Sequence, residues 1–206
     1  EALSDEMLAV AALGKIDRVR SCLQEYAALS KQENTDQGSF MIKAASELRA
    51  HGYEDSAIVI LDLAIHWYES RTPVELKLLR NSYAVALYGA RRWDQAKTIY
   101  EELAKESPDV WEYQGCIGLT AARLGDREKA LKISEWLGNI KQPYLFGGTT
   151  YYRACIAAIL GDKEEAVTLL RESLSQGYSY FQTHFDMDFE SLKDYPPFIE
   201  LMKPRG

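Results

Sequence analysis

The chain has 206 residues, of which 47% are hydrophobic, and its formal net charge is −7. This hydrophobic content is enough for a continuous core, and the negative charge argues against nucleic acid as a partner, because nucleic-acid-binding proteins carry basic patches. No stretch reaches the roughly 18 consecutive apolar residues that a membrane span needs.

A glycine followed five residues later by a small residue recurs along the chain, in the pairs Gly14/Val19, Gly52/Ala57, Gly125/Ala130 and Gly161/Ala166. A fifth site has the small residue, Ala96, but carries Arg91 where the glycine would fall. Successive small residues are 38, 39, 34 and 36 positions apart. A period in this range predicts stacked helical hairpins, an architecture that usually binds other proteins on an extended surface.

Apolar residues at helical spacing predict the helices in chain order. The expected pairs are 3–13 with 15–29, 38–51 with 53–69, 74–90 with 92–105, 109–124 with 126–138, and 147–160 with 162–175. Residues 30–37 are polar without an apolar period and are predicted to form a loop. The third pair shows the pattern clearly, since Trp93, Ala96 and Tyr100 share a helix face and Pro108 ends that helix.

This layout resembles the tetratricopeptide repeat. The matching residues are Ala84, Ala96 and Pro108 in the middle unit, Gly118, Gly125 and Ala130 in the next, and Ala154, Gly161 and Ala166 in the following one. The first hairpin, 1–29, is degenerate because Met7 replaces a small residue. The resemblance implies an all-α fold, a right-handed α-solenoid of about five such hairpins with a C-terminal helical cap, in which 38–177 form the array.

Residues 178–206 depart from the repeat. They resemble the segment that ends tetratricopeptide arrays in bacterial multidomain proteins, on the residues Asp188, Phe189, Leu192, Asp194, Pro197, Phe198 and Leu201. We expect this tail to cap the end of the array, because a solenoid end exposes an apolar face. Its phenylalanines, Phe181, Phe185, Phe189 and Phe198, would then dock on the hairpin 147–175. The alternative is a tail that folds back into the concave face and occupies it; the end cap is favoured.

The resemblance also implies a concave groove, lined by the first helix of each pair, that takes a peptide or helix of a partner protein. The family's groove positions include Leu78, Val85, Glu112 and Cys155 here, and the residues predicted to bind the partner are Arg49, Asn81, Tyr88, Arg123, Tyr151 and Tyr152. Tyrosine and arginine are typical of binding hot spots. The alternative is that the tyrosines pack against the next repeat or the tail.

We predict no catalytic residues, no cofactor and no metal site, because the sequence has no nucleophile, zinc or phosphate-loop motif. His184, Asp186 and Asp188 alternate, and on an extended segment they could hold a divalent metal. Aspartates before a short helix are more often caps, which is the interpretation that we favour.

The cysteines are Cys22, Cys116 and Cys155, too few and too widely spaced for a disulfide framework. We expect buried reduced thiols and hence a cytoplasmic protein. The predicted function is a non-enzymatic protein–protein interaction scaffold. Two alternatives stay open: the regulatory C-terminal region of a larger bacterial enzyme, such as a kinase, peptidase or hydrolase, whose catalytic domain is absent here, and self-association of the array.

Overall fold

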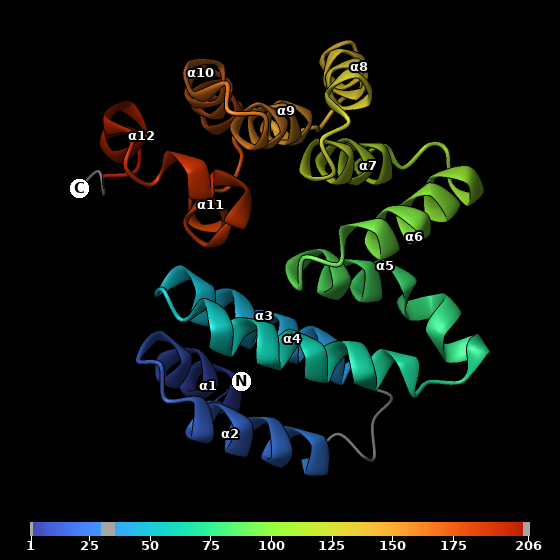
Figure 1. Cartoon of the computed structure of the whole chain (residues 1–206), viewed down its shortest axis with the longest axis vertical. Helices are drawn as coiled ribbons and strands as arrows, with labels where there is room; N and C mark the ends of the chain where they lie inside the picture. Colours follow the sequence, from blue (N-terminus) through green and yellow to red (C-terminus); the bar gives the residue numbers. More distant parts are fainter. Residues whose placement is uncertain (1, 30–35, 204–206) are drawn as a thin grey trace. The chain divides into compact units, whose positions relative to one another are not determined.

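The computed structural model describes residues 2–29 and 36–203, without the side chains of Phe181, Gln182 and Phe185. The predicted loop 30–37 therefore falls largely outside the described residues, and so does the predicted docking of Phe181 and Phe185. Within the described part the secondary structure is helical, with no strand, so the chain is all-α as expected (Figure 1). None of the described helices has the length and apolar character needed to cross a membrane.

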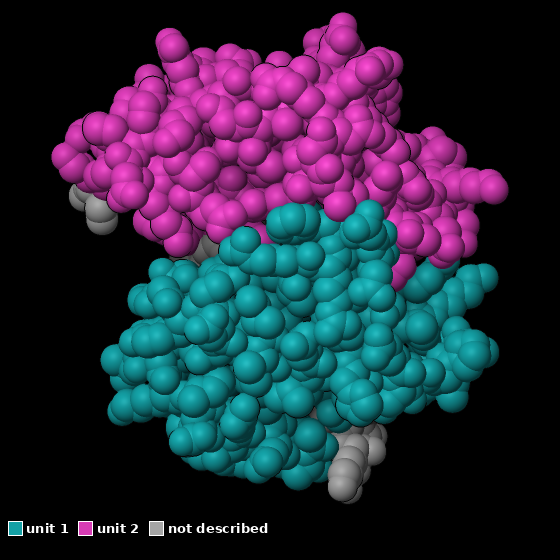
Figure 2. Space-filling model, viewed as in Figure 1, with its two compact units in different colours: residues 1–96 teal, residues 97–206 magenta. Residues whose placement is uncertain are grey.

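The chain forms two compact units, residues 1–96 and residues 97–206, which are teal and magenta in Figure 2. The helices of the first unit are α1 (Ala2–Ala12), α2 (Ile16–Leu29), α3 (Gln37–Ala50), α4 (Glu54–Glu69) and α5 (Pro73–Gly89). Helix α6 (Trp93–Glu106) spans the boundary. The second unit continues with α7 (Trp111–Arg123), α8 (Arg127–Gly138), α9 (Gly148–Ile159), α10 (Lys163–Ser175), α11 (Tyr180–Phe185), the 3₁₀ helix η2 (Met187–Leu192) and α12 (Pro196–Leu201).

In the first unit α1 packs on α2 and α3, α3 packs on α4, and α4 packs on α5. Helix α3 begins at a side-chain cap, because Asp36 Oδ1 accepts a hydrogen bond from the backbone N–H of Ser39 at 2.9 Å. The same carboxylate accepts the hydroxyl of Tyr68 at 2.9 Å, which satisfies a fully buried side chain of α4. Thr72 and Glu75 form a reciprocal capping box at the start of α5, where Pro73 is the first helical residue.

In the second unit α7 packs on α8 and α9, and α9 packs on α10. Close approach of α7 to its neighbours depends on glycine, since a Cβ at Gly118 would lie only 2.8 Å from Ile156 Cδ1 and 2.9 Å from Ile133 Cγ2. The tail that follows α10 also packs on this unit: η2 contacts α9, and α12 contacts α10.

The elbows within the helix pairs share one backbone geometry. The φ angle is positive at each of Gly14, Gly52, Gly125 and Gly161. The N–H of the glycine donates a hydrogen bond to the carbonyl three residues earlier, and the N–H of the residue after the glycine donates to the carbonyl five residues before itself. These are the two hydrogen bonds of the Schellman helix ending. Arg91 adopts the same conformation, with φ of 61° and the same hydrogen bonds, although it is not glycine. The motif found in the sequence is therefore a repeated helix stop.

The small residue five positions after each elbow is fully buried. Val19, Ala57, Ala96, Ala130 and Ala166 all have 0% of their surface exposed. Side chains of this size let two helices approach closely, and a larger one would force them apart. The recurrent pair of glycine and small residue thus sets both the turn and the spacing of the hairpins.

Candidate functional site

The predicted partner-binding residues of the first unit lie in different surroundings. Asn81 is exposed on α5, and Tyr88 is half-buried near the end of that helix. Asn81 is flanked on its own helix face by Val74, Leu78 and Val85, which are all exposed. We call this row of four residues the α5 stripe.

Arg49 was predicted to bind a partner protein, but its side chain makes hydrogen bonds within the first unit. Its side chain is about nine-tenths buried, and its guanidinium donates to Glu54 at 2.7 and 3.1 Å and to the carbonyl of Gly89 at 2.8 Å. Burial of the Glu54 carboxyl acts to raise its pKa, but hydrogen bonds and charge from Arg49 and Arg91 outweigh it, so that pKa lies below its ordinary value. Arg49 therefore joins the α3–α4 elbow to the end of α5.

Arg123, at the end of α7, is held by the tail. Its guanidinium donates to Asp188 at 2.7 Å, to Glu190 at 2.7 Å and to the carbonyl oxygen of Met187 at 3.0 Å. The side chains of Arg123 and Asp188 are 8% and 4% exposed, so the pair is buried. The guanidinium thus meets acceptors of the chain itself at the position where a partner's acceptors were expected.

Tyr151, on α9, is also covered by the tail. Its hydroxyl donates to Asp186 Oδ2 at 2.6 Å, its ring stacks on Tyr178 with centroids 3.9 Å apart, and Phe189 meets it edge-on at 5.6 Å. Burial, followed by the charge of Asp186, raises the pKa of Tyr151 well above its ordinary value. One turn further along α9, Cys155 lies beside the same carboxylate, with Sγ 3.9 Å from Asp186 Oδ2. Burial raises the pKa of this thiol too.

These contacts change the expected role of the tail. The favoured expectation was an end cap that leaves Arg123 and Tyr151 available. Helix α12 does pack on α10, but η2 packs on α9, and residues 186–190 cover Arg123, Tyr151 and Cys155. The reason is electrostatic as well as apolar, because the acidic run meets one buried arginine and one tyrosine hydroxyl. Three of the predicted groove positions of the second unit, Arg123, Tyr151 and Cys155, are therefore covered by the chain's own tail.

The alternating His184, Asp186 and Asp188 do not converge as a metal site would require. Asp186 caps η2 by accepting the N–H of Asp188 at 2.8 Å, which is the role that we favoured, and His184 is exposed. Cys155, Asp186 and Asp188 do bring ligand atoms within 4.8 Å of one another. Arg123 and Tyr151 hold those two carboxylates, so the cluster is a satisfied hydrogen-bond network.

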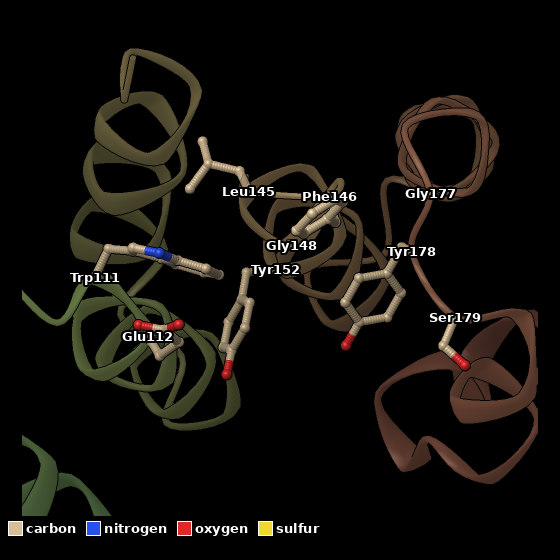
Figure 3. Close-up of a pocket in the computed structure, with 9 residues that line it drawn as sticks. All are labelled: Trp111, Glu112, Leu145, Phe146, Gly148, Tyr152, Gly177, Tyr178 and Ser179. Carbon is tan, nitrogen blue, oxygen red and sulfur yellow. The ribbon is translucent and has the colours of Figure 1, made fainter. Parts of the chain in front are cut away.

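Tyr152, the last predicted residue, lines a hollow on the second unit (Figure 3). The hollow has a volume of about 370 Å³, and its walls include the side chains of Trp111, Glu112, Leu145, Phe146, Tyr152 and Tyr178. Trp111 meets Tyr152 edge-on, with centroids 5.6 Å apart and planes at 87°. The hydroxyl of Tyr152 lies 3.7 Å from Cys116 Sγ, and burial raises the pKa of Cys116 to about 11. We call this hollow the aromatic pocket.

Comparison with known protein families identifies the repeat. The model of the family described as "Tetratricopeptide repeat" matches residues 83–109, which comprise the last seven residues of α5, all of α6 and the turn that follows. Residues 83–109 are a tetratricopeptide repeat. No curated protein matches the chain. Tetratricopeptide repeats are typical of non-catalytic scaffolds for protein interactions, and this class of function agrees with the sequence.

Two residues of the aromatic pocket could be predicted from the tetratricopeptide pattern. Tyr152 and Glu112 lie on repeat helices, so position within the unit pointed to both. Phe146 and Tyr178 lie outside the repeat, the first in an insertion before α9 and the second at the start of the tail. The aromatic residues of these two segments were the available signal. Neither segment has an apolar period that would predict contact with α7 or α9.

Proposed function

We propose that this chain is a protein–protein interaction module whose α5 stripe binds a peptide or helix of a partner. The observation that supports this proposal is the exposure of a row of aliphatic side chains, with Val74 76% and Leu78 82% exposed. Val74, Leu78, Asn81 and Val85 follow the spacing i, i+4, i+7 and i+11, which places them on one helix face. Contiguous apolar side chains in water are typical of interaction surfaces.

The chemistry of the stripe suits an amphipathic segment. Aliphatic side chains at helical spacing accept the apolar face of a partner helix, whose own anchors recur three or four residues apart. Asn81 adds an amide that both donates and accepts hydrogen bonds. Within the second unit Arg123 and Tyr151 are engaged by the tail, so this proposal assigns partner binding to Asn81 and Tyr88 of the first unit.

The domain arrangement belongs to the same proposal. Residues 1–29 are a degenerate first hairpin, 38–177 are the repeat array, and 178–206 are a capping segment. Chemistry within this chain is not part of the proposed function, because the titratable side chains that cluster beneath the tail bond to one another.

A peptide-display experiment tests the proposed function. A library of amphipathic peptides is selected on the full chain, and the Kd of the enriched sequences is measured by calorimetry. Leu78→Glu is expected to weaken binding at least tenfold, because it places a charge in the apolar contact. Leu63→Glu is the matched control, since Leu63 is an exposed leucine of a different helix, α4. Peptides that tolerate Leu78→Glu but are lost with Leu63→Glu would contradict the proposal. So would a dimer that Leu78→Glu converts to monomer, because the partner would then be a second copy.

A further inference from the structure

We propose that the aromatic pocket of the second unit binds the side chain of an arginine from a partner protein. This inference rests on the proposed function as an interaction module, and it adds the chemistry of one partner residue. It concerns a surface separate from the α5 stripe, so the two can be tested independently.

The walls of the pocket supply aromatic surface of the kind that attracts cations. Trp111, Phe146, Tyr152 and Tyr178 all line the hollow (Figure 3). A guanidinium within about 6 Å of such a ring is attracted by the negative charge of the ring face, most strongly by tryptophan and tyrosine. Two of these rings are fixed in place: Tyr178 stacks on the buried Tyr151, and Tyr152 packs edge-on against Trp111. The pocket therefore does not need to reorganise these rings on binding.

The charge of the pocket is also complementary to a cation. Glu112, at the start of α7, contributes a carboxylate, and no lysine or arginine is among the lining residues. Among the residues with described side chains, Glu112 has neither an ion-pair partner nor a side-chain hydrogen-bond partner. A carboxylate beside aromatic rings, with no cationic partner among the described side chains, is the arrangement that a partner's cation would complete.

Arginine fits this pocket better than other side chains. A volume of about 370 Å³ is at the lower end of the range for ligand pockets, and it suits one long side chain rather than a large ligand. The guanidinium is planar, so it can stack on a ring while its N–H groups bond a carboxylate in two places. An apolar side chain would take the Glu112 carboxylate out of water without a partner, which is unfavourable.

The test uses three short peptides and the full chain. Acetyl-Gly-Arg-Gly-amide is titrated into ¹⁵N-labelled protein, and the shift of the Trp111 indole N–H is followed, with the resonance assigned from Trp111→Phe. The second peptide carries citrulline, which has nearly the shape of arginine but no charge, and the third carries lysine. We expect millimolar binding of the arginine peptide, a Kd at least fivefold weaker for lysine, and no saturable binding of citrulline.

Two charge variants locate the contact. Glu112→Gln keeps the shape of the side chain and is expected to weaken the arginine peptide at least threefold. Asp109→Asn removes the same charge from an exposed residue just before α7, outside the lining, and is expected to change the Kd little. Equal binding of citrulline and arginine, tighter binding of lysine, equal effects of the two variants, or an unperturbed Trp111 signal would each overturn the inference. If the inference fails while Leu78→Glu still weakens binding of the selected peptides, the proposed function stands. If the arginine peptide binds as expected but Leu78→Glu leaves the selected peptides unaffected, only the binding role assigned to the α5 stripe is overturned.

Discussion

The guanidinium of Arg123 and the carboxylate of Asp188 form a buried ion pair, with Nη2 and Oδ1 2.7 Å apart, although 65 residues separate them in the chain. Glu190 and the carbonyl of Met187 complete the surroundings of the same guanidinium. A last-turn residue of a repeat helix and an acidic segment of the tail are therefore satisfied by each other. The tail is bound to this unit by polar contacts as well as by its apolar side chains.

Replacing Arg123 tests this relationship. Arg123→Ala is expected to lower the free energy of unfolding by about 3–5 kcal/mol, because it leaves the buried Asp188 carboxylate without its cation. Arg127→Ala is the control, since Arg127 forms a pair with Asp162 at the same 2.7 Å but about half of each side chain is exposed. The control is expected to cost about 0–1 kcal/mol. Equal losses for the two variants in urea denaturation would show that the buried pair has no special role.

The fully buried small residue of each hairpin leads to a second prediction. Ala130→Leu adds three carbon atoms where Ala130 has 0% exposure, so overpacking is expected to cost about 1–3 kcal/mol. Glu135→Leu, at an exposed position of the same helix, is the control and is expected to change stability by about 0.5 kcal/mol at most. A melting temperature unchanged by Ala130→Leu would mean that α7 and α8 do not pair through this residue.

Arg91 occupies an elbow where the other hairpins have glycine, and its φ of 61° is strained for a residue with a Cβ. Arg91→Gly is therefore expected to be about 1 kcal/mol more stable than Arg91→Ala, because both variants lose the ion pair with Glu54 but only alanine keeps the strain. The order is expected to reverse at Arg20, which is exposed within α2, where alanine is favoured over glycine by about 1 kcal/mol. The same order at both sites would contradict the left-handed geometry of Arg91.

The lowered pKa of Glu54 predicts a pH dependence. The ordinary pKa of this carboxyl is 4.5, and the folded state holds it lower, because hydrogen bonds and charge from Arg49 and Arg91 outweigh the opposing effect of burial. Its stabilising contribution is therefore fully present above pH 4.5 and is lost as the pH falls through the folded-state pKa. The protein is expected to be more stable than Glu54→Gln at pH 7, and the difference should shrink between pH 5 and pH 3. A pH-independent difference in chemical denaturation would contradict this assignment.

Local patterns explain how much of the fold could be predicted. The elbows at Gly125 and Gly161 and the buried Ala130 and Ala166 follow from backbone and packing rules that act within one hairpin, so the period reveals them. The contacts of Arg123 with the tail do not follow from such rules, because they join segments more than 60 residues apart.

The aromatic pocket was missed for a related reason. Phe146 belongs to an insertion and Tyr178 to the start of the tail, and neither segment has a period that would orient it. Apolar content predicted that the tail would dock, but it did not predict on which face. Asp186 and Asp188 were interpreted as helix caps in preference to metal ligands, although their charge is also complementary to that of Arg123.

Removing residues 178–206 tests the role of the tail as a whole. Phe189, Leu192 and Leu201 are buried in the folded chain, and burial of each such side chain is worth about 1.5–3 kcal/mol. Their loss would also expose Tyr151 and Cys155 and would leave Arg123 without its acidic partners. We therefore expect the truncated protein to unfold at lower urea concentration and to aggregate, with no gain in peptide binding.

A point variant separates the apolar and polar parts of this effect. Phe189→Ala is expected to cost about 3–5 kcal/mol, because it leaves a cavity against Tyr151 and Phe198. Asp186→Asn keeps the volume and weakens only polar contacts, namely the hydrogen bonds that this carboxylate accepts from the Tyr151 hydroxyl and the N–H of Asp188. Its cost is therefore expected to be smaller, about 1–2 kcal/mol. A truncated protein that stays soluble and folded and binds peptides more tightly would contradict a structural tail. In that case residues 186–190 would be a segment that a partner displaces from Arg123 and Tyr151.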